Sequence, residues 1–302
     1  MKNFGQIAVI ISLSAVSGPV FGQSAPAAAG DRDAMRKLAE TVPKLDIVGI
    51  KLGMSPQEAM AAIKAADPKL KIDIINTTLQ RPGVQQHDRV PHWIVAHTVG
   101  LRGSFAAVDN SKEIIVVQFT MPPGHSVVAR VMREVGFPDN EPVMASNLTS
   151  ALDKKYGEGA PANGDRIWLF DSTGKLIANP ALFVQRGCMT GAIYAGGNEF
   201  PMFERDYDPA RVYGEISLDS TAHLKGNTAD SIPACTSVAL VQGRALWATP
   251  PNTLMRSMTV TIESPGLLYA SRKATHDWLQ QEADAIIKRQ NDEASKRGAP
   301  KL

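Results

Sequence analysis

Residues 46–59 constrain the fold most strongly, because they combine a short strand, a glycine turn and a complete helix-start signal. Ser55 can accept a hydrogen bond from the amide of Glu58, and the Glu58 side chain can reach back to the amide of Ser55, which is a capping box. Pro56 occupies the first helical position, where its missing N–H costs nothing. The Asp-Pro step at residues 67–68 ends the helix. We therefore expect the first folded unit here.

The composition is that of an ordinary globular chain, with 302 residues, of which 44% are hydrophobic and 21% are charged. This length allows one large domain or two smaller ones, each able to bury a core. The chain carries 32 basic and 30 acidic residues, so its formal net charge is +2. Because the sequence contains no strongly basic stripe, we expect no nucleic-acid partner.

The first residues have the pattern of a secretory signal peptide. Lys2 is followed by a short apolar core at residues 7–16, and Gly18 breaks that core. The alternative is a buried N-terminal helix, but charge, apolar core and break come in the order that export needs. We expect cleavage near Gly22, a disordered lead-in over residues 23–30, and a periplasmic or secreted protein. No later run is long and apolar enough to span a bilayer, so we expect no stable membrane insertion.

Cys188 and Cys235 are the only cysteines in the chain. A single pair in an exported protein predicts one structural disulfide. The functional alternative is a redox pair, but the sequence has no C-x-x-C motif that would tune a reactive thiol. We therefore predict a Cys188–Cys235 disulfide.

Residues 31–121 are predicted to form a first α+β module. A modest helix over residues 31–41 precedes the capped helix. Stretches with alternating or β-branched apolar residues predict strands over residues 69–79, 93–99 and 112–121. Successive strands after a helix, without regular crossovers, favour an antiparallel sheet.

Residues 122–302 are predicted to form a second α+β module, which would contain the disulfide. Apolar residues at helical spacing between Val128 and Val135 predict a helix, with Ser126 as its N-cap and Gly136 as its C-terminal cap. This helix would begin a second cycle of helix and sheet.

The remaining patterns of the second module predict a helix over residues 147–157, a β-hairpin over 167–177, a strand over 255–262 and a helix over 267–294. We expect the last helix to pack on a sheet. A coiled coil is the alternative, although the heptad repeat is not sustained. The expected fold class is therefore α+β, with two helix-plus-antiparallel-sheet modules, a long C-terminal helix and one disulfide.

The segment from Gly49 to Ala59, GIKLGMSPQEA, resembles the opening of the small bacterial outer-membrane assembly lipoproteins and of the β-lactamase inhibitory protein modules. The segment from Ser150 to Gly157, followed by Trp168, is similar to a pattern of uncharacterised periplasmic proteins. The resemblance implies a bacterial, exported, non-catalytic binding or assembly module, and no site residues carry over from it. The chain departs from the lipoproteins because it lacks their lipid-bearing cysteine.

Three histidines recur at intervals of five residues, at His87, His92 and His97. A zinc site needs three or four ligands that converge on one point. Residues five apart on a strand face opposite sides, and on a helix they diverge by about 140°. We therefore expect surface or partly packed histidines and no metal site, although a loop spanning His87 to His92 could form a two-ligand site.

The segment from Gly124 to Val128 matches a nucleophile elbow in part, but Val128 replaces the small residue that this motif needs. Histidines and carboxylates follow later in the chain, as they do in any long sequence. The chain also has no P-loop, dinucleotide fingerprint or H-E-x-x-H motif. We therefore assign no catalytic residue and expect no cofactor.

An acidic and aromatic stretch at residues 199–208 is the predicted partner-binding loop. Exposed aromatics on a fixed scaffold favour recognition. The residues that we predict to contact a partner are Phe200, Phe203, Glu204, Asp206 and Tyr207. The alternatives are an ordered surface loop without function, or a pair of carboxylates for glycoside hydrolysis.

These patterns together predict an exported, soluble, non-catalytic binding or interaction protein, whose partner is another envelope protein. The alternative is a secreted hydrolase with a noncanonical carboxylate or serine site within residues 196–227. The sequence does not determine the oligomeric state.

Overall fold

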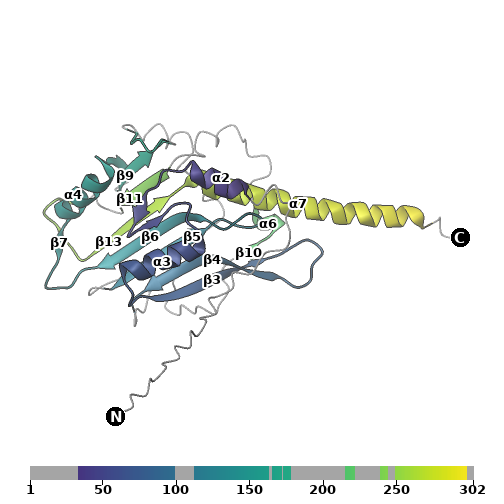
Figure 1. Cartoon of the computed structure of the whole chain (residues 1–302), viewed down its shortest axis with the longest axis horizontal. Coiled ribbons are helices and arrows are strands. Elements are labelled where there is room, and N and C mark those ends of the chain that lie inside the picture. Colours follow the sequence, from purple (N-terminus) through teal and green to yellow (C-terminus); the bar gives the residue numbers. More distant parts are fainter. Residues whose placement is uncertain are drawn as a thin grey trace, which may run out of the picture.

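The computed structural model of the chain describes residues 33–98, 112–162, 165–171, 173–177, 215–221, 239–243 and 249–297. In these ranges the chain has an α+β fold built on a nine-stranded sheet, with helices on both faces (Figure 1). None of the helices within these ranges is long and apolar enough to cross a membrane.

The sheet has the strand order β10-β3-β4-β5-β6-β13-β11-β9-β8. The strands are β3 (Lys71–Leu79), β4 (Asp88–His97), β5 (Glu113–Phe119), β6 (Val128–Gly136), β8 (Ala160–Ala162), β9 (Asp165–Phe170), β10 (Glu215–Ile216), β11 (Ala239–Gly243) and β13 (Ser257–Glu263). Neighbouring strands are antiparallel, except that β10 runs parallel to β3. Two small antiparallel pairs lie outside this sheet, β1 (Asp46–Ile47) with β2 (Ile50–Lys51), and β7 (Val143–Met144) with β12 (Leu254–Met255).

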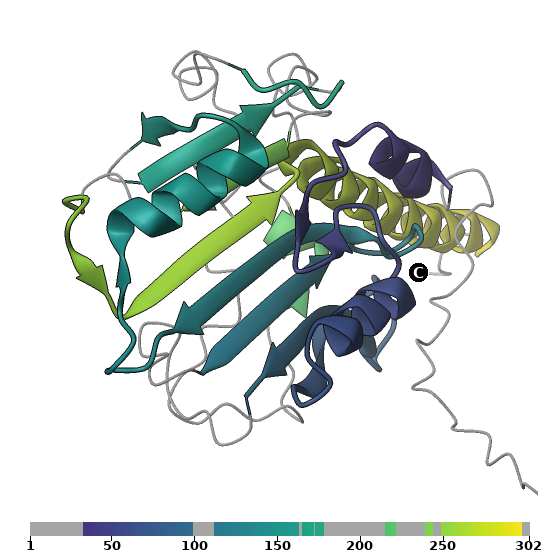
Figure 2. The same cartoon turned by 60° about the vertical axis from the view of Figure 1, so that its left-hand side comes forward.

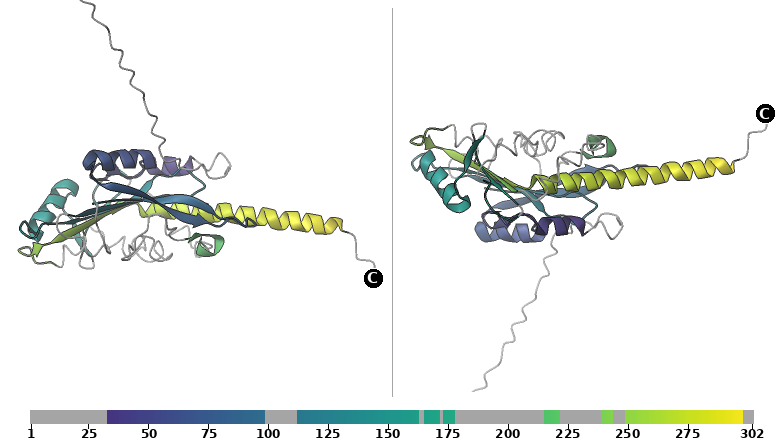
Figure 3. Two further views of the ribbon diagram at one scale, coloured as in Figure 1. Left: turned by 90° about the horizontal axis from the view of Figure 1, so that it is seen from below. Right: turned by 90° about the horizontal axis from the view of Figure 1, so that it is seen from above.

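The helices are α2 (Ala34–Glu40), α3 (Pro56–Ala66), α4 (Ala145–Tyr156), α6 (Leu218–Thr221) and α7 (Pro265–Lys296). In Figure 2, α3, α4 and the β1–β2 hairpin lie in front of the sheet and α7 lies behind it. We call these two sides the α3–α4 face and the α7 face. Figure 3 shows α2 and α3 on one side of the sheet and α6 on the other.

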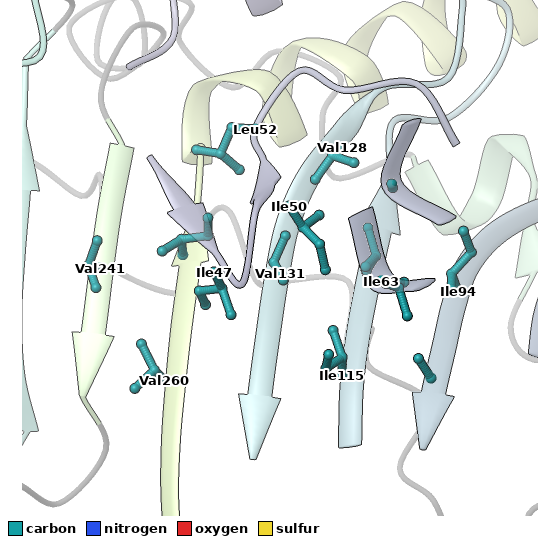
Figure 4. Packing of buried hydrophobic residues seen from close by; sticks show 14 of the residues in the cluster. Ile47, Ile50, Leu52, Ile63, Ile94, Ile115, Val128, Val131, Val241 and Val260 are labelled. Atoms are coloured by element: carbon teal, nitrogen blue, oxygen red, sulfur yellow. The ribbon is translucent and has the colours of Figure 1, made fainter. Parts of the chain in front are cut away.

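The main core fills the space between the sheet and the elements of the α3–α4 face (Figure 4). Ile50 from the hairpin, Ile63 from α3 and Ile115 from β5 are fully buried there. The central strands β4, β5 and β6 are buried on both faces, which explains their nearly continuous apolar sequences. The core therefore holds the hairpin, α3 and α4 against one side of a shared sheet.

The structure confirms the predicted helix start. The Ser55 hydroxyl accepts a hydrogen bond from the Glu58 amide at 3.3 Å, and the Ser55 amide donates to the Glu58 carboxylate at 2.8 Å. Pro56 is the first residue of α3, and the extended backbone of Asp67 ends the helix. The turn between β1 and β2 precedes α3 and closes the β1–β2 hairpin, and Val48 in this turn lies in the left-handed region at a φ of 46°.

The predicted helix between Val128 and Val135 is wrong, because this segment is the strand β6. A β-bulge is the physical reason. Gln118 pairs with Arg130 and Phe119 pairs with Val128, so Ala129 is an extra residue in the ladder. The bulge lets Val128 and Val131 share the same core at a spacing of three residues, which imitates a helical period. Ser126 is therefore no helix cap.

The other predicted elements agree closely with the structure. The predicted helices at residues 31–41, 147–157 and 267–294 correspond to α2, α4 and α7, and the predicted strands at 69–79, 93–99, 112–121 and 255–262 correspond to β3, β4, β5 and β13. Phe170 bridges to Leu176 across the predicted hairpin. The α+β class is confirmed. Strands from both predicted modules lie in one sheet, and the division into two modules stays a prediction. Cys188 and Cys235 lie outside the described residues, so the disulfide also stays a prediction.

Candidate functional site

The candidate site is the junction between the sheet and the first half of α7. The helix begins after β13, where the Ser264 hydroxyl caps it by accepting from the Leu267 amide at 3.3 Å and Pro265 takes the first helical position. Apolar residues alone do not hold this half of the helix. The residues of α7 that are both buried and polar are Ser271, Arg272, Thr275 and His276.

Polar and aromatic side chains from four neighbouring strands line the α7 face beneath the start of the helix. Trp93 on β4 is paired with Gln118 on β5, Gln118 is paired with Arg130 on β6, and Arg130 is paired with Glu263 on β13. Arg130 and Glu263 form an ion pair, with 3.0 Å between Nε and Oε2, and both are largely buried. One row across the sheet therefore carries charge and hydrogen-bonding groups into the interior.

His92 lies beside this row and is held as a neutral imidazole. It occupies a β-bulge in β4, because Ile75 pairs with Trp93 while the next residue, Asn76, pairs with Pro91. Burial, and to a smaller extent the nearby charge of Arg272, lowers the pKa of His92 to about 3. The neutral ring can accept the hydrogen bond from the Gln118 amide group, at 3.2 Å between the two Nε2 atoms.

Three buried polar atoms of the junction have no hydrogen-bond partner among the described residues. They are the Gln118 Oε1, the Trp93 Nε1 and the Tyr269 hydroxyl. Leaving such an atom unpaired costs about 1–3 kcal/mol. Within the described residues, the interior of the junction therefore contains unpaired donors on Trp93 and Tyr269 and an unpaired acceptor on Gln118.

Side chains further along α7 bind the neighbouring backbone and α6. The Ser271 hydroxyl accepts from the Met121 amide at 2.6 Å, and the Thr275 hydroxyl donates to the Pro122 carbonyl. His276 Nδ1 lies 3.0 Å from the Thr221 hydroxyl on α6. Because each contact needs a particular side chain on α7, a shift of the helix by one turn would unpair all of them.

The β3–β4 loop holds α7 at the point where the helix leaves the sheet. Arg81 makes a bidentate ion pair with Glu282, with Nε–Oε2 and Nη2–Oε1 distances of 3.0 Å and 2.6 Å. The same guanidinium lies over the Trp278 ring, 5.6 Å from its centroid. Gly83 faces Ile286 so closely that a Cβ atom at Gly83 would lie 2.7 Å from its Cδ1.

Beyond this loop α7 continues as an exposed helix, which we call the arm (residues 287–296). Figure 1 shows the arm extending away from the sheet. All of its residues are exposed. Ile287 is its one large apolar residue, and 54% of its surface is accessible.

The structure places the predicted histidines in different environments. His87 is exposed in the β3–β4 loop, and His92 is part of the buried junction. His97 is buried at the other end of β4, where its Nε2 lies 3.1 Å from the Asp73 carboxylate. Within the described ranges, no group of three or more His, Cys, Asp or Glu side chains could hold a metal ion.

The predicted partner-binding residues Phe200, Phe203, Glu204, Asp206 and Tyr207 lie outside the described residues, so their role stays a prediction. The junction itself was not predicted. Two signals in the sequence could have indicated it. Gln118 is the one polar residue in the apolar run of β5. Tyr269, Arg272 and His276 follow one another at helical spacing on a helix that was expected to pack on a sheet.

No protein-family model, curated protein or solved structure matches the chain.

Proposed function

We propose that this chain is an exported, non-catalytic binding protein of the bacterial envelope, and that the arm of α7 contacts a partner protein. The export pattern at residues 2–22 supports the location. The observation that carries the proposal is an exposed helical arm on a base that is fixed by buried polar contacts.

An isolated helix of about ten residues is marginal in water, so the arm needs a source of order. Oppositely charged residues alternate along it at a spacing of four, as in Lys288–Asp292, Arg289–Glu293 and Asp292–Lys296. Such pairs stabilise a helix by about 0.2–0.5 kcal/mol each. The junction and the β3–β4 loop fix the helix that the arm continues, so the arm is a preformed element that loses little entropy on binding.

The surface of the arm is more typical of a protein-binding surface than of a catalytic site. Ile287 is exposed between charged residues, and a large apolar side chain of this kind is a natural anchor for a hydrophobic pocket on a partner. The predicted aromatic loop at residues 199–208 is a second contact region in this proposal. The partner is another envelope protein.

Affinity capture with matched arm variants tests the proposal. The chain from Gln23 onward is immobilised in its oxidised form and exposed to envelope extract, with an unfolded sample as the blank. We expect one saturable protein partner. Ile287→Lys should weaken its capture about tenfold or more, because a charge would have to enter an apolar pocket.

Ala285→Lys is the matched control. It adds the same charge to an exposed position about 200° around the helix from Ile287, so capture should persist. If no partner binds above the blank, or if the two variants weaken capture equally, the arm is not the recognition surface. A screen for hydrolase activity would then test the alternative.

A further inference from the structure

Among the residues that the structure describes, the outer edge of β3 is unpaired along most of its length. β10 pairs only with Thr78 and Leu79 at the end of β3. Among the described strands, none pairs with the outer side of residues 71–77. Figure 3 (left) views the molecule from below, towards this edge of the sheet. An unpaired edge of this length is a ready template for another strand.

The β10 contact shows which backbone groups face outward. The Gln80 amide donates to the Ile216 carbonyl at 2.8 Å, so the even-numbered residues of β3 direct their N–H and C=O groups away from β4. The bulge beside Asn76 leaves this alternation intact, because the extra residue is in β4. The outward groups of the open edge therefore belong to Ile72, Ile74 and Asn76.

We propose that two copies of this chain pair through the β3 edge in antiparallel register, with a two-fold axis at Ile74, so that the two sheets become continuous. In this register Ile72 lies opposite Asn76 of the second copy, and the two Ile74 residues face each other. All of these positions are even-numbered, so each pair exchanges both hydrogen bonds. The open edge is centred on Ile74 and ends where β10 begins. This surface is independent of the arm.

The side chains of the edge fit this register. Ile72 and Ile74 are half-buried on the α3–α4 face, where they pack against the main core. Pairing would place Ile74 of the second copy against Ile74, and Asn76 of the second copy against Ile72. On the α7 face, Asp73 already forms an ion pair with Lys71, and its carboxylate lies 3.1 Å from His97 Nε2. The central pairs therefore bring no like charges together.

The competing explanation is that β3 is a protected edge. Lys71 is half exposed, and lysine on an edge strand discourages pairing, as does a short covering strand such as β10. This explanation predicts a monomer. The two explanations therefore differ in the oligomeric state of the whole chain.

Sedimentation velocity of the chain from Gln23 onward, over a range of concentrations, tests the proposal. We expect a monomer–dimer equilibrium. Ile74→Lys places two ammonium groups directly opposite each other, and Asn76→Pro removes the one outward N–H group of residue 76 from each copy while leaving the β4 ladder intact. Each variant should raise the dissociation constant about tenfold or more. Ile287→Lys makes the same kind of substitution on the arm and should leave the dimer unchanged.

Amide hydrogen exchange resolved by residue tests the register and guards against misfolding. In the dimer, the amides of Ile72, Ile74 and Asn76 should exchange more slowly than in dilute monomer, whereas those of Asp73 and Ile75 should be protected in both. Near-ultraviolet circular dichroism must show that the variants are folded. A chain that is monomeric at every concentration overturns the proposal, and so does a dimer that neither edge variant weakens.

Discussion

Lowering the pH from 7 to 5 should destabilise this protein through one buried histidine. His92 is 2% exposed, and its folded environment keeps it neutral. Burial opposes the charged form first, and the charge of Arg272 opposes it second. The unfolded chain has no such restriction, so below the ordinary pKa of histidine it binds a proton that the folded chain does not bind.

The size of the effect follows from the two pKa values of His92. The folded pKa is about 3 and the unfolded pKa is 6.5, so the folded value is the lower one. The unfolded state therefore gains protons first as the pH falls, and stability falls with it. Integrating the proton linkage from pH 7 to pH 5 gives a loss of about 2 kcal/mol in the free energy of unfolding. Between pH 6.5 and pH 3 the slope approaches about 1.4 kcal/mol per pH unit.

Urea denaturation at pH 7 and pH 5 measures this loss, with His92→Gln as the test variant. Glutamine keeps an acceptor for the Gln118 amide but does not titrate, so the variant should lose about 2 kcal/mol less than the parent between the two pH values. His87→Gln is the control, because His87 is exposed and should leave the pH profile unchanged. If His92→Gln and the parent lose the same free energy, His92 is not held neutral in the folded state.

Three further predictions concern stability. Arg81 and Glu282 are replaced singly and together in a double-mutant cycle, measured by urea titration. The coupling energy should be about 1 kcal/mol and should fall with added salt, because the pair is bidentate but about a quarter exposed. A coupling energy near zero would mean that the pair does not hold the base of the arm. Ile63→Ala should cost about 2–5 kcal/mol in the same assay, since Ile63 is fully buried beneath α3, and a cost below about 1 kcal/mol would contradict the docking of this helix. Trp168→Phe should lower the free energy of unfolding by about 2–3 kcal/mol, because it unpairs the Gly157 carbonyl that accepts from Trp168 Nε1 at 2.7 Å. An unchanged thermal unfolding temperature would show that this hydrogen bond does not stabilise the fold.

Much of the fold could be predicted where the signals are local. The capping box of Ser55 and Glu58 and the stripe of α4 that ends at Gly157 each depend on residues within one helix. Both were predicted to within about two residues. The strand β6 was not, because its bulge at Ala129 is created by pairing with β5 and cannot be read from β6 alone. The bulge changes the apparent period of a strand into that of a helix.

The junction was harder to predict than any single element. His92, Gln118 and Arg272 come from β4, β5 and α7, and nothing in the sequence near each residue indicates the other two. In the sequence alone, Gln118 is a single polar residue near the end of the apolar run of β5. Its burial and its contact with His92 depend on the strand order of the sheet and on the path of α7 across it. Such a site becomes visible only when the tertiary arrangement is known.

The position of β13 in the sheet determines when the sheet can be completed during folding. β3 to β6 follow one another in both sequence and space, so this meander needs only local contacts, which form quickly. β13 lies between β6 and β11 although it is the last of the described strands in sequence order. Until residues 257–263 are available for pairing, β6 has no neighbour on that side and the two halves of the sheet remain separate. Pairing of residues 257–263 is therefore the event that closes the sheet, and a chain that stops earlier carries an unprotected edge at its centre.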